Sequence, residues 1–295
     1  MNSGLFAALM FPALFALILS GLPVAFSLIA VAFVFGIPFF GMNLGTQLFG
    51  NLLEIGTNYT LSAIPLFILM GSILEKSGIA ERLFQSMLIW VGRMPGGLSV
   101  AALAMCSIFA ASTGVFGAVE VIIGLMAIPV MMRLRYNPGL VAGTICAGGS
   151  LGTIIPPSVV MLVYATITDL SVGDLFAGIM LPGLLMATMF IVYVVVRCLL
   201  RPQDGPVVPR EMFAEISLPQ KLLATVTAIV PALVLIAAVL GSILAGIASP
   251  TEAAAVGVLG GLVLTAAYGR LSSAMMIEAL KKAVTLSAVI MIILA

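Results

Sequence analysis

The sequence predicts an all-α polytopic membrane protein, and three observations indicate this class. The 295-residue chain is 62% hydrophobic and 8% charged, with a mean hydropathy of +1.30, whereas soluble domains carry about 25% charged residues. Its uncharged stretches are long enough for spanning helices, which need about 20 residues. The segment GGSLGTIIPPS at 148–158 then interrupts one such stretch with two prolines and several small residues, which predicts a discontinuous helix.

The uncharged stretches set the expected order of elements. The first 53 residues have no charged side chain and allow two crossings, separated at the Ser-Gly-Leu-Pro sequence of residues 20–23. Interfacial or connecting helices are expected at 43–53 and 77–92. Further spans are expected at about 57–75, 138–166, 174–198, 221–246 and 250–269, with a last one beginning near Ala283. The polar, proline-rich residues 201–220 are expected to form a cytoplasmic linker with a loop and a surface helix.

Residues 94–132 are expected to form a helical hairpin. They contain a single charge, Glu120, and arginines flank them at Arg93 and Arg133. Cytoplasmic loops are enriched in Lys and Arg. With the N-terminus outside and this segment entering and returning, all the cations fall inside. These are Lys76, Arg82, Arg93, Arg133, Arg135, Arg197, Arg201, Arg210, Lys221, Arg270, Lys281 and Lys282.

The same charge pattern fits two thin spans as well as a re-entrant hairpin. The sequence AASTGVFGAVE at 110–120 favours the hairpin, because small polar residues interrupt the apolar run halfway along it. The outer loops then hold only the acids Glu54, Asp169 and Asp174. Irregular backbone at membrane depth is tolerated only where it is buried in protein or lines a wet cavity.

The two prolines of the opening segment have a physical consequence. Pro156 and Pro157 have no N–H, so the carbonyls of Gly152 and Thr153 lose their usual helical partners. Together with the nearby glycines, they predict two half-helices at about 138–151 and 158–167. Free carbonyls attract a cation, and the N-terminus of the second half-helix attracts an anion. A proline kink with local repair is the alternative, and the interrupted hairpin 40 residues earlier favours the break.

Four segments carry a resemblance to a known family. The long one spans 110–165 and reads AASTGVFGAVEVIIGLMAIPVMMRLRYNPGLVAGTICAGGSLGTIIPPSVVMLVYA. The shorter ones are SGLPVAFSLIAV, AIPLFILMGSILEKSG and ASPTEAAAVGVLGG. Together they resemble the large membrane subunit of tripartite ATP-independent periplasmic (TRAP) transporters, and the resemblance covers essentially the whole chain.

The resemblance implies an inverted-repeat secondary transporter of the elevator type, with a re-entrant helical hairpin and a discontinuous helix in each repeat. It would import organic acids, with Na+ as the coupling ion and no other cofactor. Its partners would be a periplasmic substrate-binding protein and a small four-helix membrane subunit. It would lie in the bilayer of the bacterial inner membrane, with the N-terminus periplasmic.

Members of this family are longer than 295 residues. Residues 1–200 would form the first inverted repeat, and residues 221–295 would form the start of an incomplete second one. The chain stops inside the apolar run SAVIMIILA, where a terminal carboxylate would lie in lipid. We therefore expect a C-terminally truncated subunit.

The hairpin turn and the helix break supply the candidate binding residues. Hydroxyl and carbonyl oxygens at both places suit a sodium ion, for which Ser112, Gly152 and Thr153 are the first choices. Close packing of small residues is the alternative for the hairpin turn. The sodium- or substrate-binding candidates are Ser112, Thr113, Gly114, Glu120, Gly149, Ser150, Gly152, Thr153, Ile155, Pro156, Pro157 and Ser158.

Two glutamates allow more than one interpretation. A carboxylate at membrane depth costs several kcal/mol when it is unpaired, so Glu120 is either part of the substrate path or paired within the structure. Ser249 and Glu252 have the S-x-x-E spacing of a capping box, with a proline at the first helical position. We expect them to cap a helix, and a functional role is the alternative.

Other classes of function fit less well. The chain has no histidine, which removes His-based catalysis and His-ligated metal sites. It has no basic patch with interleaved aromatic residues, which argues against binding to nucleic acid. An intramembrane aspartyl protease would need paired aspartates, and Asp169 and Asp174 lie in one loop without a Gly-x-Gly-Asp motif. A two-component sodium-coupled anion transporter or a sodium–proton exchanger of related architecture is the nearer alternative.

Overall fold

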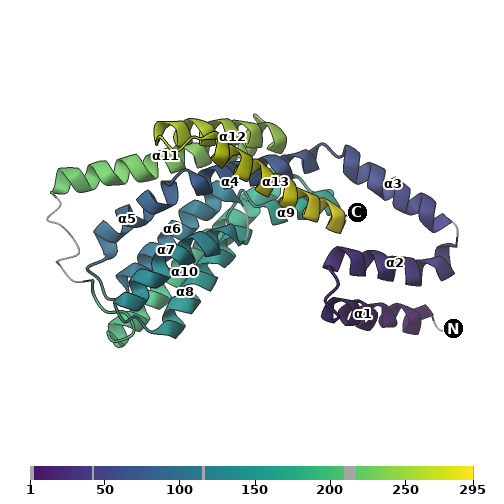
Figure 1. The fold of residues 1–295 in the computed structure, drawn as a ribbon, viewed down its shortest axis with the longest axis horizontal. Helices are drawn as coiled ribbons and strands as arrows, with labels where there is room; N and C mark the ends of the chain where they lie inside the picture. Colours follow the sequence, from purple (N-terminus) through teal and green to yellow (C-terminus); the bar gives the residue numbers. More distant parts are fainter. Residues whose placement is uncertain (1–2, 42, 115–116, 209–216, 295) are drawn as a thin grey trace. The chain divides into compact units, whose positions relative to one another are not determined.

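The computed structural model describes residues 3–41, 43–114, 117–208 and 217–294. Within these ranges every regular element is a helix (Figure 1), which confirms the all-α membrane class. Among the described residues, three helices are long and apolar enough to cross a membrane, or up to five when each bent helix pair is counted as one span. Val115, Phe116, Arg210 and the expected surface helix after it lie outside the described residues.

The chain divides into two units, which are described separately. The first comprises the residues up to Tyr59 and those from Val284 onward. Its helices are α1 (Ser3–Leu19), α2 (Val24–Phe40) and α3 (Asn43–Thr57). The Phe6 ring lies 4.9 Å from that of Phe35, so aromatic contacts hold α1 against α2.

The second unit, Thr60–Ala283, contains the hairpin and the broken helix. Its elements are η1 (Thr60–Ser62), α4 (Ala63–Lys76), α5 (Ile79–Val91), α6 (Gly97–Thr113), α7 (Ala118–Arg133), α8 (Pro138–Ile154), α9 (Val159–Ile167), α10 (Val172–Leu200), α11 (Leu218–Leu244) and α12 (Pro250–Ala267). Helix α6 is buried along most of its length, between α5, α8 and α10. A helix that is apolar on all sides belongs inside a bundle, and α6 forms the centre of this one.

Helix α12 lies along α4, as Figure 1 shows. Glycines allow the two helices to approach closely, since a Cβ at Gly257 would overlap the sulfur of Met70. At the ends of these helices, the Arg82 guanidinium stacks over the Tyr268 ring at 4.5 Å. Helices α4, α5 and α12 are thus fixed both along their length and at one end.

The last helix contains the last expected span. Helix α13 spans Ser273–Leu294, and the span expected from near Ala283 lies within it, after a charged first part. Two of these charges are paired with α4, Glu278 with Lys76 and Lys282 with Glu75. The ion pairs join the first part of α13 to α4.

Candidate functional site

Helices α6 and α7 pack against each other as a hairpin, and Gly114 and Gly117 are the described residues at its tip. The tip begins at Gly114, which caps α6 with φ +61° and donates its N–H to the Ala110 carbonyl. Gly117 precedes α7 with φ +81°. Glycine adopts this left-handed region at no steric cost, so the two glycines permit the reversal of the chain.

The two ends of the hairpin meet at one loop. The Gly96 N–H donates to the Gly205 carbonyl at 2.8 Å, and the Asn137 N–H donates to the Asp204 carbonyl at 2.9 Å. Residues 96 and 137 flank the hairpin and bind neighbouring residues of the same loop. The segment therefore leaves and returns at one end of the bundle, which is inconsistent with a single crossing.

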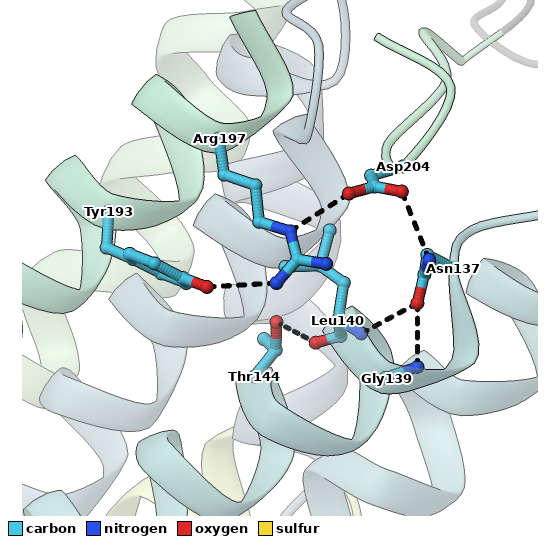
Figure 2. A network of polar contacts seen from close by, with 7 residues as sticks. All are labelled: Asn137, Gly139, Leu140, Thr144, Tyr193, Arg197 and Asp204. Atoms are coloured by element: carbon cyan, nitrogen blue, oxygen red, sulfur yellow. Dashed lines mark hydrogen bonds and ion pairs between the residues drawn. The ribbon is translucent and has the colours of Figure 1, made fainter. Parts of the chain in front are cut away.

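A polar network fixes this end of the hairpin (Figure 2). The Asp204 carboxylate accepts hydrogen bonds from Arg197 Nε at 2.9 Å and from Asn137 Nδ2 at 3.1 Å. The hydrogen bond from Arg197, and then that from Asn137, lower the pKa of Asp204. Asn137 also caps α8 by accepting the N–H groups of Gly139 and Leu140. One carboxylate thus joins the end of α10 to the start of α8.

This network was not among the predicted site residues. The Asn-Pro pair at 137–138 is a recognisable start signal for a helix, and it could have identified Asn137 as a cap. Asp204, which accepts hydrogen bonds from both Asn137 and Arg197, lies 67 positions after Asn137 in the chain. No local spacing indicates this contact.

Helices α8 and α9 are separated at residues 155–158, with a bend of 41° between them. The last helical hydrogen bond at the end of α8 runs from the Ile155 N–H to the Leu151 carbonyl at 2.8 Å. Pro156 has no N–H to offer the Gly152 carbonyl. The Ser158 hydroxyl donates to the Thr153 carbonyl at 2.8 Å, so a side chain replaces the amide that Pro157 lacks.

The first half-helix is longer than expected. It was predicted to end near Leu151, because the glycines at 148, 149 and 152 were interpreted as sites of unwinding. The structure corrects this interpretation, since all three glycines are helical. A Cβ at Gly148 would overlap the Cys106 sulfur of α6, and one at Gly149 would overlap the Glu120 side chain of α7. These two glycines allow the hairpin to pack closely on α8.

The hairpin tip contacts the helix break directly. The Val159 N–H, at the start of α9, donates to the Gly114 carbonyl at 3.1 Å. A Cβ at Gly114 would lie 2.5 Å from the Pro157 carbonyl oxygen. Two irregular segments that are about 45 residues apart in the chain therefore form one junction.

Helix α4 forms a third side of this junction. A Cβ at Gly71 would lie 2.8 Å from the Thr113 carbonyl oxygen, so α4 approaches the last turn of α6 backbone to backbone. Gly71 was not predicted as a site residue, since its segment has no charge or irregularity at that position. Its closeness to Thr113 depends on the tertiary structure.

The hydroxyl groups at the junction donate their protons locally. Ser112 donates to the Ile108 carbonyl at 2.9 Å, and Thr113 donates to the Phe109 carbonyl at 3.0 Å. On α8, Thr153 donates to the Ser150 carbonyl and Ser150 donates to the Ala147 carbonyl, both at 2.7 Å. A hydroxyl oxygen keeps lone pairs after it has donated. The junction is therefore rich in oxygen atoms that can accept a hydrogen bond or ligate a cation.

Glu120 supplies the carboxylate nearest to this junction. It lies in the first turn of α7, is half-buried, and rests against Gly149 of α8. A carboxylate is stabilised near a helix N-terminus, so its place on α7 reduces the cost of holding a charge there. The structure brings Glu120 together with the candidate residues of both the hairpin and the broken helix.

Ser249 and Glu252 have a different role. Ser249 is the N-cap of α12, its N–H and hydroxyl both donate to Glu252 Oε2 at 2.8 Å, and the Glu252 N–H donates to Ser249 Oγ at 3.3 Å. This reciprocal pair is a capping box. The two side chains therefore serve the start of α12.

The donor set at the junction excludes some kinds of metal site. Among the described residues, no three His, Cys, Asp or Glu side chains come together in a way that could hold a metal ion. The oxygens at the junction are carbonyls and hydroxyls, with the single carboxylate of Glu120. Hard oxygen donors of this kind differ from the thiolate and imidazole ligands that bind zinc and copper.

The sequence matches one family over nearly its whole length. Residues 11–295 match the family model described as the DctM component of tripartite ATP-independent periplasmic transporters. The C4-dicarboxylate TRAP transporter large permease protein of Pseudomonas aeruginosa is 40% identical over 206 residues, which cover 70% of this chain and 46% of that protein. The sialic acid TRAP transporter large permease protein of Vibrio cholerae is 32% identical over 281 residues, 93% of this chain and 62% of that protein.

A third relative carries a further substrate name. The ectoine/5-hydroxyectoine TRAP transporter large permease protein of Ruegeria pomeroyi is 31% identical over 261 residues, 88% of this chain and 59% of that protein. The chain thus spans about half the length of the curated relatives that it matches.

Proposed function

Because the chain belongs to the DctM family of TRAP transporter components, we propose that it serves in the large membrane subunit of a sodium-coupled importer of organic acids. The relatives are named for C4-dicarboxylates, sialic acid and ectoines, so the proposal covers a class of substrate and not one compound. The partners would be a periplasmic binding protein and a small membrane subunit. The location would be the bacterial inner membrane, with the N-terminus periplasmic.

The junction between the hairpin tip and the helix break carries the proposal. The Val159–Gly114 hydrogen bond brings two irregular segments together inside an apolar bundle. Non-helical backbone among spanning helices is characteristic of ion and substrate sites in transporters. We assign the sodium site to the Gly152 carbonyl, with oxygens of Thr153 and Ser112 as further ligands.

Sodium is a suitable coupling ion for this set of donors. Carbonyl dipoles can replace the water around a small cation without burying a full counter-charge. Each positive charge that moves inward at 100 mV supplies about 2.3 kcal/mol, whereas an anionic substrate alone moves against the same field. A substrate carboxylate would lie near the N-terminus of α9, where the helix dipole favours negative charge.

The same junction suggests which part would move. The hairpin and the broken helix share a packed interface through Gly148, Gly149 and Gly114. Close packing of this kind favours motion of α6–α9 as one body in an elevator mechanism. Glu120 would move with this body and remain beside the site.

Uptake into proteoliposomes tests the function. The chain, extended to the length of its relatives, is reconstituted with the small membrane subunit, and uptake of labelled C4-dicarboxylate is measured under an imposed sodium gradient. The 295-residue chain serves as the comparison and should give no uptake. Uptake should require both the gradient and added binding protein. Uptake without binding protein would favour a two-component transporter, a response to a proton gradient would favour an exchanger, and absence of uptake under every condition would contradict the proposal.

A further inference from the structure

One face of α10 forms an open groove of about 680 Å³ near the C-terminal end of the helix. Met189, Val192 and Val196 lie along it, and Leu200, which is 78% exposed, lies towards its end. These positions recur every three or four residues, so they share one side of the helix. The groove is apolar for most of its length.

The end of the groove is positively charged. Arg197 and Arg201 are both among its lining residues. Arg197 donates to Asp204 and, through Nη1, to the Tyr193 hydroxyl at 2.9 Å, as Figure 2 shows. Arg201 makes no ion pair with any carboxylate that the structure describes. Two guanidinium groups therefore face one carboxylate, which leaves a net positive charge.

From this arrangement we infer that the groove binds an anionic phospholipid, with an acyl chain along Met189–Leu200 and the phosphate on Arg201. The lining from Met189 to Val196, before the first arginine, covers about seven residues or roughly 10 Å of helix. This length fits within one leaflet of a hydrocarbon core that is about 30 Å thick. Basic residues at the end of a membrane helix attract anionic head groups, and the charge at Arg201 selects for such a lipid.

Native mass spectrometry of the full chain in neutral detergent tests the head-group contact. Phosphatidylglycerol and phosphatidylcholine with identical acyl chains are titrated separately. One basic residue is worth about 1 kcal/mol, so phosphatidylglycerol should bind about fivefold more tightly, and Arg201→Gln should remove most of this preference. Arg201→Lys, which keeps the charge, should retain it. Arg133→Gln removes an exposed arginine at the end of another helix and serves as the matched control.

A second variant tests the apolar part of the site. Val192 is 52% exposed, so Val192→Trp should fill the groove without disturbing the bundle and weaken the binding of both lipids at least threefold. Free glycerol phosphate should not compete at concentrations equal to the lipid.

Three results would overturn the inference. These are equal affinity for the two lipids, equal loss in Arg133→Gln and Arg201→Gln, or displacement of lipid by glycerol phosphate. Protection of a Leu200→Cys thiol by the small membrane subunit in lipid-free detergent would likewise overturn it, by assigning the groove to a protein.

Discussion

The amide of Val159 donates to the carbonyl of Gly114 at 3.1 Å, so the first residue of α9 is bonded to the tip of the hairpin. The Pro157 carbonyl lies so close to Gly114 that any side chain there would meet it at 2.5 Å. The helix break and the hairpin tip are therefore one structural element, and changes in either segment should affect both.

Gly114→Ala should destabilise the protein more than Gly117→Ala. Both glycines have positive φ, so an alanine is strained at either position, by about 1–2 kcal/mol in the left-handed conformation that Gly114 adopts. Only the Cβ at residue 114 also meets the Pro157 carbonyl, since nothing lies within 4 Å of a Cβ at residue 117. Overpacking should cost Gly114→Ala about 1–3 kcal/mol more. Chemical denaturation in detergent measures the difference, and equal losses in the two variants would contradict the close contact.

Gly149→Ala should weaken the packing of the hairpin against α8 and lower the stability of the protein. Its Cβ would overlap the Glu120 side chain, with an expected loss of about 1–3 kcal/mol. Combining it with Glu120→Ala should restore part of that loss, as a double-mutant cycle would show. Gly143→Ala is the control on the same helix, since its Cβ meets nothing within 4 Å and alanine favours a helix by up to about 1 kcal/mol. Additive effects at 120 and 149 would show that the two residues are not in contact.

The Asp204 network should make stability depend on pH in the acid range. The hydrogen bond from Arg197 lowers the pKa of Asp204 in the folded protein. The stability that the ionised Asp204 carboxylate contributes is therefore complete above the ordinary aspartate pKa of about 3.9. It is lost as the pH falls through the lowered pKa of Asp204 in the folded protein. Asp204→Asn should melt at a lower temperature than the parent at pH 7, and the difference should narrow below about pH 4.

The exposed residue Asp169 provides the control for this pH dependence. Its φ of +53° is one that asparagine also tolerates, so Asp169→Asn should change the melting temperature little at either pH. A gap between Asp204→Asn and the parent that stays constant down to pH 3 would contradict the role of the ion pair.

Pro156→Ala with Pro157→Ala should raise the sodium concentration needed for half-maximal uptake. The new N–H at position 156 can bond the Gly152 carbonyl, which would then be less available to a cation. The Thr153 carbonyl already accepts the Ser158 hydroxyl, so the main effect is expected at Gly152. The variant should still insert and assemble, as size-exclusion chromatography would show. A sodium dependence equal to that of the parent would mean that the prolines only bend the helix.

The orientation of the chain can be tested with impermeant thiol reagents. In a background without Cys106, Cys146 and Cys198, single cysteines at positions 93, 133 and 201 should be protected from reagent added outside intact cells. Cysteines at positions 169 and 174 should be labelled. Labelling at position 133 with protection at position 93 would contradict the hairpin, whose two ends meet at the loop of Asp204 and Gly205.

Features that depend on local sequence could be predicted well. The helix break follows from the missing N–H groups of Pro156 and Pro157, and the capping box follows from the spacing of Ser249 and Glu252. In both cases the cause and its effect lie within five residues of each other. The all-α membrane class follows from composition, which is also independent of the tertiary structure.

Features that depend on distant partners could not be predicted. Gly148 and Gly149 were interpreted as unwinding residues, because their partners Cys106 and Glu120 lie on other helices. The ion pairs of α13 to Glu75 and Lys76 join residues that lie about 200 positions apart in the chain. The contact between Gly71 and Thr113 has no signal in either segment.

Amide hydrogen exchange in sodium and in potassium tests the central claim most directly, namely that the hairpin tip and the helix break bind sodium together. The purified chain is exchanged at equal ionic strength in the two salts, and peptides covering 110–120 and 150–160 are compared with a control peptide from α10. A shared site predicts that sodium slows exchange in both segments, including the Val159 amide, and leaves α10 unchanged. Identical exchange in the two salts, or slowing in only one of the two segments, would contradict it.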